Sequence, residues 1–265
     1  MEKQLLFQKH TVNYNISGSG PTLVLLHGFL ESLAIWDDFA GALSKTNKVI
    51  AIDLPGFGKT DIFSENHTME FMADVVNAVL ENENINHCLI VGHSMGGYVS
   101  LAFAKKYEVK LKGLVLFHSH AGGDDEQGIA NRNRTIEIVR KNHKNFISEF
   151  IPLLFAEDNI EKYRNEITKL KTDSLQTSAQ GVMSALAGMR DRQDNTELLK
   201  NLNIPVLFIV GKQDSRIPMD KILPQIALPK HSEALIIDGV GHMGFIEARK
   251  QTLLTLAHFG IKNEK

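Results

Sequence analysis

One short segment of the sequence combines a nucleophilic residue type with the glycines that a sharp turn requires. Residues 92–97 read GHSMGG, so Ser94 stands at the centre of a G-x-S-x-G pattern. The apolar run 88–91 precedes it, and residues 98–107 follow it with helical spacing. A serine on a strand-to-helix turn projects its hydroxyl out of the sheet, and flanking glycines avoid collision with nearby backbone. The pattern predicts a nucleophilic Ser94, with a plain glycine turn as the alternative interpretation.

A serine hydroxyl is a weak nucleophile and needs a base, which in turn needs a group that fixes its tautomer. Among the 11 histidines, His242 follows the last apolar run and is expected at the sheet edge from which Ser94 emerges. Asp214 follows the run 206–210 and is the predicted orienting acid. Helix capping and a local turn are the alternative roles of these two residues. Asp53 is the rival acid, but it begins a Pro-Gly turn, which favours a structural role.

A second group of polar residues follows another apolar run. His118, Ser119 and His120 are followed by Asp124 and Asp125, and histidine and carboxylate groups are suitable metal ligands. Their spacing matches no familiar zinc signature. We therefore predict a polar wall beside the active site and no bound metal.

The elements that must position these residues are indicated by apolar runs of strand length. Continuous apolar runs are typical of strands buried on both faces of a parallel sheet. They alternate with segments of helical periodicity, which predicts an α/β fold. Two shorter strands are expected first, at 4–8 and 12–16, and the apolar runs are 22–26, 49–52, 88–91, 114–117, 206–210 and 234–237.

The alternation is interrupted between residues 120 and 196. This stretch is rich in charges, shows helical periodicity and contains no strong strand run. We predict a core of residues 1–119 and 197–265, built on a mostly parallel, doubly wound sheet of about eight strands. Residues 120–196 are predicted to form a helical cap insertion over Ser94.

Five segments in this order resemble the motifs of the α/β-hydrolase family: 27–29, 53–58, 92–97, 211–214 and 241–242. The resemblance implies that Ser94, Asp214 and His242 form a catalytic triad. It also implies an oxyanion hole made by the backbone N–H groups of Phe29 and Met95. No metal or organic cofactor is implied.

The expected function is that of a serine hydrolase, most simply a carboxylesterase that cleaves small to medium uncharged esters through an acyl-enzyme on Ser94. A lactonase, a carbon–carbon bond hydrolase, a perhydrolase and a slow-turnover ligand sensor are alternatives on the same fold. A basic cap residue facing the site would favour a charged substrate, with Arg132, Arg134, Arg190 and Arg192 as candidates. The residues expected to contact substrate are Phe29, Leu30, His118, Phe150, Leu154, Met183 and Met243.

Composition limits the other partners. The chain of 265 residues has 29 Lys and Arg against 31 Asp and Glu, so its formal charge of −2 gives no reason to expect nucleic acid or an anionic membrane. A single cysteine, Cys88, excludes an intrachain disulfide framework and a multi-cysteine zinc site. With no recognisable signal peptide and no apolar run long enough to span a bilayer, a cytoplasmic protein is expected. The choice between monomer and homodimer stays open.

Overall fold

The computed structural model describes residues 1–263 and contains one eight-stranded sheet, in the order β1-β2-β4-β3-β5-β6-β7-β8. β1 pairs with β2 and β2 with β4 in antiparallel fashion, whereas every other pairing is parallel. The predicted mostly parallel sheet of about eight strands is therefore confirmed. The strands are β1 (Glu2–Phe7), β2 (His10–Ser17), β3 (Thr22–Leu26), β4 (Lys48–Ile52), β5 (Cys88–His93), β6 (Leu111–Phe117), β7 (Val206–Gly211) and β8 (Ser232–Ile237).

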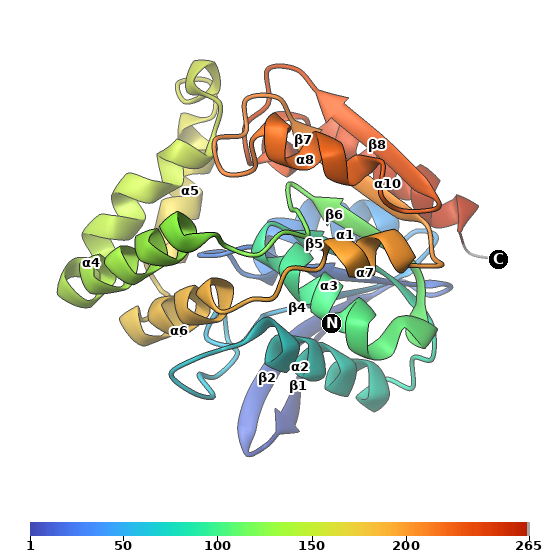
Figure 1. Cartoon of the computed structure of the whole chain (residues 1–265). Coiled ribbons are helices and arrows are strands. Elements are labelled where there is room, and N and C mark those ends of the chain that lie inside the picture. Colours follow the sequence, from blue (N-terminus) through green and yellow to red (C-terminus); the bar gives the residue numbers. More distant parts are fainter. Residues whose placement is uncertain (264–265) are drawn as a thin grey trace.

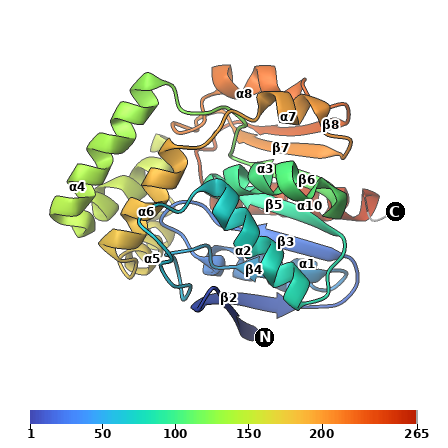
Figure 2. The same ribbon diagram turned by 60° about the horizontal axis from the view of Figure 1, so that its bottom comes forward.

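Burial explains why the interior strands are so apolar. β5 and β7 are buried along their whole length, because each has a neighbouring strand on both sides and the sheet has helices on both faces. The edge strand β8 alternates between exposed and half-buried residues instead. Helices α2 (Met69–Asn82) and α3 (Met95–Tyr107) cover one face of the sheet, and α1 (Asp37–Leu43) and α10 (Arg249–Lys262) cover the other (Figures 1 and 2).

Residues 126–190 form a helical layer beyond one end of the sheet (Figure 2). Its helices are α4 (Glu126–Phe150), α5 (Arg164–Ser174) and α6 (Ala179–Arg190), with the short 3-10 turns η3 (Ile151–Leu154) and η4 (Glu157–Asn159) between α4 and α5. α4 is kinked at Asn142, whose backbone is not helical. α7 (Thr196–Asn201) then leads back to the sheet, and α8 (Met219–Ile226) follows β7. No helix within residues 1–263 is long and apolar enough to cross a membrane.

Two segments whose apolar residues recur with helical spacing are each divided. Residues 33–43 form the 3-10 turn η1 (Leu33–Trp36) before α1, and residues 245–259 fall into α9 (Gly244–Glu247) and α10. The second break lies at Ala248, whose φ of −134° and ψ of 36° leave the helical region. Sequence periodicity runs through both breaks and therefore cannot detect them.

Candidate active site

Ser94 sits on a strained turn between β5 and α3. Its φ of 49° and ψ of −115° are unusual for a residue with a side chain, and its N–H donates to the Phe117 carbonyl at 2.9 Å. The two glycines of the pattern have separate reasons to be glycine. A Cβ on Gly92 would lie 2.3 Å from the carbonyl oxygen of Gly96, and a Cβ on Gly96 would lie 2.5 Å from that of Leu26. The turn is therefore tight enough to exclude any other residue type at both positions.

The predicted acid and base meet at the carboxyl end of the sheet. His242 Nδ1–H donates to Asp214 Oδ2 at 2.8 Å, and both side chains are buried. Asp214 Oδ1 accepts the backbone N–H groups of Arg216 and Ile217 at 2.8 and 2.9 Å. With Nδ1 protonated and bonded to the carboxylate, Nε2 of His242 is left free to accept a proton. Ser94 and His242 both line one cavity, so the geometry suits the base role.

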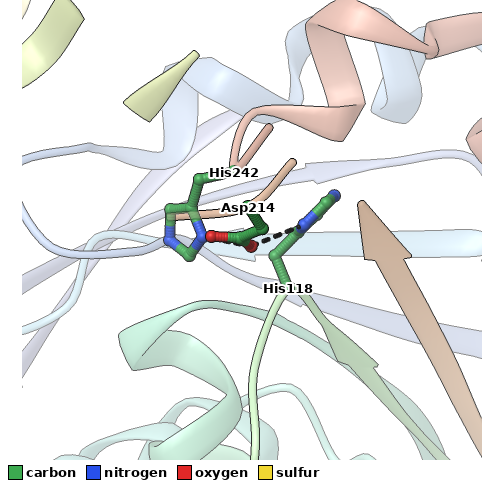
Figure 3. Close-up of side chains that lie close together, drawn as sticks. All are labelled: His118, Asp214 and His242. Carbon is green, nitrogen blue, oxygen red and sulfur yellow. Dashed lines mark hydrogen bonds and ion pairs between the residues drawn. The ribbon is translucent and has the colours of Figure 1, made fainter. Parts of the chain in front are cut away.

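A second histidine, which the sequence reasoning placed on the substrate wall, also contacts Asp214. His118 Nδ1 lies 3.0 Å from Asp214 Oδ2, so the carboxylate lies between two imidazole rings (Figure 3). Burial lowers the pKa of His118 to about 4, which keeps the ring neutral. Burial acts to raise the pKa of Asp214, yet that pKa is held well below its ordinary value because His242 and His118 surround the carboxylate. His118 therefore helps to hold the Asp214 carboxylate in place, and it does not line the cavity.

This grouping also bears on the metal hypothesis. Among residues 1–263, the group of side chains close enough to share a metal ion is His118, Asp214 and His242, with ligand atoms within 4.8 Å of one another. Both Nδ1 atoms in it are hydrogen-bonded to the carboxylate, which accounts for the proximity. His120 points elsewhere and packs edge-on against Tyr98, with ring centroids 5.5 Å apart. The side chains of His118 and His120 therefore have different partners and are not placed to share a metal ion.

The loop after β3 faces Ser94. A Cβ on Gly28 would lie 3.1 Å from Ser94 Cβ, so the loop backbone passes directly beside the nucleophile. His27 braces this loop, because its Nδ1–H donates to the Gly28 carbonyl and its Nε2 accepts the Leu54 N–H. Within the described residues, the N–H of Phe29 has no acceptor. Met95 is the first residue of α3, where a helix N–H has no intrahelical partner.

A buried ion pair, which the sequence analysis did not identify, joins this loop to the turn at Ser94. His93 Nδ1–H donates to Glu31 Oε2 at 2.9 Å, and His93 Nε2–H donates to the His242 carbonyl at 3.0 Å. Both ring nitrogens face acceptors, so the ring is an imidazolium. Burial opposes this charge, but Glu31 raises the pKa of His93, and His93 in turn lowers that of Glu31 against the effect of burial. Glu31 Oε2 also accepts the Gly28 N–H at 2.6 Å.

Asp53, the rival acid, is engaged in holding backbone. Its carboxylate accepts the Leu33 N–H at 2.8 Å, the Lys59 N–H at 2.9 Å and the Asn13 amide at 2.9 Å. No histidine is bonded to it within residues 1–263. This arrangement accounts for a buried aspartate without assigning it a part in proton transfer.

The cavity has a volume of about 430 Å³ and lies between the helical layer and the sheet. Three of the seven expected contact residues line it, namely Phe29, Phe150 and Leu154. His118 and Met243 are fully buried, Leu30 packs into the core, and Met183 lies a turn before the lining residues of α6, so these four are absent from the lining. Of the four candidate arginines, Arg132 lines the cavity, whereas Arg134, Arg190 and Arg192 are absent from its lining. Other lining residues include Glu31, Tyr98, Leu186, Met189 and Arg216.

A carboxylate from α9 holds the loop that carries His242. Glu247 accepts the N–H groups of Gly241 and Met243 at 3.1 and 3.2 Å, on either side of the histidine. It also accepts the Ala156 N–H at 3.0 Å and the Asn159 amide at 2.7 Å. One side chain therefore ties the histidine loop to the segment between η3 and α5.

Comparison with known proteins identifies the family. The model of the alpha/beta hydrolase fold family matches residues 21–249. The chain belongs to this family. This result confirms the expected family and fold and, with them, the expectation of a hydrolase.

Several relatives cover nearly the whole chain. It is 26% identical over 253 residues to a pimeloyl-[acyl-carrier protein] methyl ester esterase of Aeromonas hydrophila, covering 91% of this chain and 96% of the relative. It is 28% identical to a 2-hydroxy-6-oxononadienedioate/2-hydroxy-6-oxononatrienedioate hydrolase of Paraburkholderia phymatum, covering 87% and 84%. A thermophilic esterase from Thermogutta terrifontis, solved with malate bound, superposes with a TM-score of 0.94 at 29% identity and 100% coverage of both chains.

Proposed function

We propose that this protein is a serine carboxylesterase that cleaves small to medium esters through an acyl-enzyme on Ser94. The observation that carries the proposal is the His242–Asp214 hydrogen bond of 2.8 Å beside a cavity that Ser94 also lines. His242 takes the Ser94 proton as Oγ attacks the ester carbonyl, and then gives it to the leaving alcohol. Water activated by the same histidine releases the acid product.

The oxyanion N–H groups and Asp214 stabilise the charges that develop during this reaction. The N–H groups of Phe29 and Met95 bind the oxyanion, and such donors contribute ~10²–10³ to kcat in comparable sites. Asp214 stabilises the imidazolium that forms on His242. The names of the Aeromonas and Thermogutta relatives support ester hydrolysis, and the cavity of about 430 Å³ supports a substrate of modest size. The cytoplasmic location stays a prediction.

Cleavage of a carbon–carbon bond is the second candidate, and it is supported by the name of the Paraburkholderia relative, a hydrolase of unsaturated oxo-diacids. The same serine, histidine and aspartate would serve it. An ester panel and a ring-cleavage diketone, assayed on one preparation, separate the two. A kcat/KM for the diketone well above that for every ester would favour this candidate.

The test is steady-state hydrolysis of 4-nitrophenyl acetate, butyrate and octanoate by the wild type, Ser94→Ala and Ser148→Ala. Ser148 is a half-buried serine of α4 outside the cavity lining and serves as the matched control. We expect repeated turnover by the wild type and the control, and a loss of about 10³-fold or more in Ser94→Ala. Equal activity of Ser94→Ala would contradict the proposal, and a single burst without turnover would indicate a ligand sensor.

A further inference from the structure

Two guanidinium groups from distant parts of the chain border the candidate active-site cavity. Arg132 comes from α4, and Arg216 comes from the loop between Asp214 and α8. Ser94 and His242 line the same space. Positively charged groups therefore border the volume that a substrate would occupy.

The nearby carboxylate of Asp124 is already shared between two cations. Its Oδ2 lies 3.0 Å from Nε of Arg132, and its Oδ1 lies 2.8 Å from Nη1 of Arg192. Among residues 1–263, the Nη groups of Arg132 have no protein acceptor. Burial, with a contribution from Arg192, lowers the pKa of the neighbouring His120 to about 4, so that ring stays neutral. One negative charge thus faces two positive ones.

Arg216 has no counterion at all in the described part of the chain. Its guanidinium makes no ion pair or hydrogen bond there, and it lies over the Phe150 ring at 5.0 Å from the centroid. Burial lowers the pKa of Arg216 and Arg132 lowers it further, whereas Asp214 opposes them. The group nevertheless stays charged, because a guanidinium does not lose its proton in proteins.

The other carboxylates near the cavity, Asp214 and Glu31, are already engaged with other partners, and within residues 1–263 neither forms an ion pair with Arg216. Asp214 accepts four N–H groups, two from histidine rings and two from backbone. Glu31 is paired with the His93 imidazolium and with the Gly28 N–H. The Arg216 side chain is exposed, so an incoming carboxylate can reach it, and the positive potential of Arg216 and Arg132 beside Ser94 favours an anionic group there.

We infer that Arg216, assisted by Arg132, forms a subsite for a carboxylate carried by the ester substrate. A planar guanidinium binds a carboxylate through two parallel hydrogen bonds, which fits a single unpaired arginine better than a spherical anion does. The apolar side chains of Phe146, Phe150 and Leu154 line the same cavity and suit a methylene chain. The substrate is therefore a half-ester of a dicarboxylic acid or an ester of a hydroxy acid, in place of the uncharged ester expected from the sequence. This inference rests on the proposed esterase function.

The first test compares pairs of esters of equal length that differ in charge. On the acyl side, monomethyl adipate is set against methyl hexanoate; on the alcohol side, the acetate of 4-hydroxybutyric acid is set against butyl acetate. We expect the wild type to prefer the charged member of one pair in kcat/KM by at least ten-fold. In Arg216→Gln this preference should fall by about ten- to hundred-fold, since a charge-assisted hydrogen bond is lost. The matched control is Arg140→Gln, an exposed arginine of α4 outside the cavity lining, which should keep the preference.

The second test does not depend on turnover. Binding of monomethyl adipate to Ser94→Ala is measured by calorimetry and compared with Ser94→Ala carrying Arg216→Gln, with the hydroxybutyrate acetate as the second ligand. Tighter binding by Ser94→Ala than by the double variant supports the subsite, even if no ester is turned over and the proposed function fails. Hydrolysis of neutral and charged esters at equal rates, or equal binding by the two variants, would overturn the inference and leave the esterase proposal intact.

Discussion

The imidazole of His93 donates its Nε2–H to the backbone carbonyl of His242 at 3.0 Å, so the residue before the nucleophile holds the residue that acts as its base. The same ring donates to Glu31, whose carboxylate accepts the Gly28 N–H of the oxyanion loop. One buried ion pair therefore joins three loops from different parts of the chain. Their relative positions determine the geometry of the whole candidate site.

Replacing Glu31 tests this connection. In Glu31→Gln the His93 imidazolium loses its counterion, and breaking a buried pair by removing one partner costs about 3–5 kcal/mol. We expect the free energy of unfolding in urea at pH 6 to fall by that amount, and kcat to fall with it. Glu197→Gln removes an exposed carboxylate of α7 and should stay within about 0.5 kcal/mol of the wild type. An unchanged stability in Glu31→Gln would show that the pair contributes nothing net.

The pH dependence of stability follows from the direction of the two pKa shifts. The pKa of His93 is raised above its ordinary 6.5, so its contribution is fully present below pH 6.5 and is lost as the pH rises through the raised value. The pKa of Glu31 is lowered from 4.5, so its contribution is present above pH 4.5 and is lost as the pH falls through the lowered value. We expect the stability difference between wild type and Glu31→Gln, measured by thermal melting, to be largest between pH 4.5 and 6.5 and to shrink at alkaline pH. A difference that grows from pH 7 to 10 would contradict this assignment.

The two candidate acids are separated by asparagine substitution. Asp214→Asn keeps the shape of the side chain but removes the charge that fixes the His242 tautomer, so kcat should fall by about 10⁴-fold with the fold retained. Asp53→Asn removes an acceptor of backbone N–H groups, so its effect should appear as a lower melting temperature, with much of kcat retained in the folded fraction. Steady-state kinetics beside a melting curve for each variant gives the answer. The reverse pattern would make Asp53 the orienting acid.

The turn at Ser94 offers a matched pair of glycine substitutions. Gly92→Ala would place a Cβ 2.3 Å from the Gly96 carbonyl, a contact that backbone can relieve only by moving the nucleophile. Gly41 lies inside α1 with nothing within 4 Å of its Cβ position, so Gly41→Ala should stabilise the protein by about 0.5–1 kcal/mol. We expect Gly92→Ala to yield little folded or active protein in the same expression and melting assays. Full activity of Gly92→Ala would mean that the turn is looser than the structure shows.

Sequence reasoning predicted what depends on local pattern. Each buried strand carries a continuous apolar run, and the ends of parallel strands meet at one edge, so Ser94, Asp214 and His242 could be placed together. The turn at Ser94 could also be predicted from the sequence, because its glycines stand where the backbone passes too closely for a side chain. The breaks at residues 36 and 248 could not be predicted, since helical periodicity runs unchanged through both.

The rest of the site depends on pairs that no spacing reveals. Glu31 and His93 are 62 positions apart, and His118 and Asp214 are 96 apart. His118 looked like a wall residue because it ends a strand at the correct edge, but neighbouring β7 brings Asp214 beside it. Arg216 is exposed, as most arginines are, and the sequence could not show that it lines the cavity or that no described carboxylate pairs with it.

The loop that carries His242 should depend on Glu247. Its carboxylate accepts N–H groups on both sides of the histidine and two more from the segment between η3 and α5. Glu247→Gln keeps the size but replaces one acceptor oxygen with a donor, which would repel an N–H and shift the histidine. Since small misplacements of a catalytic group are costly, we expect kcat to fall by about ten-fold or more, with KM changed less than three-fold. Glu233→Gln, a half-buried residue of β8 paired with Lys262, is the control. A rise in KM with kcat intact would instead show that Glu247 acts by fixing the segment between η3 and α5 and not by positioning His242.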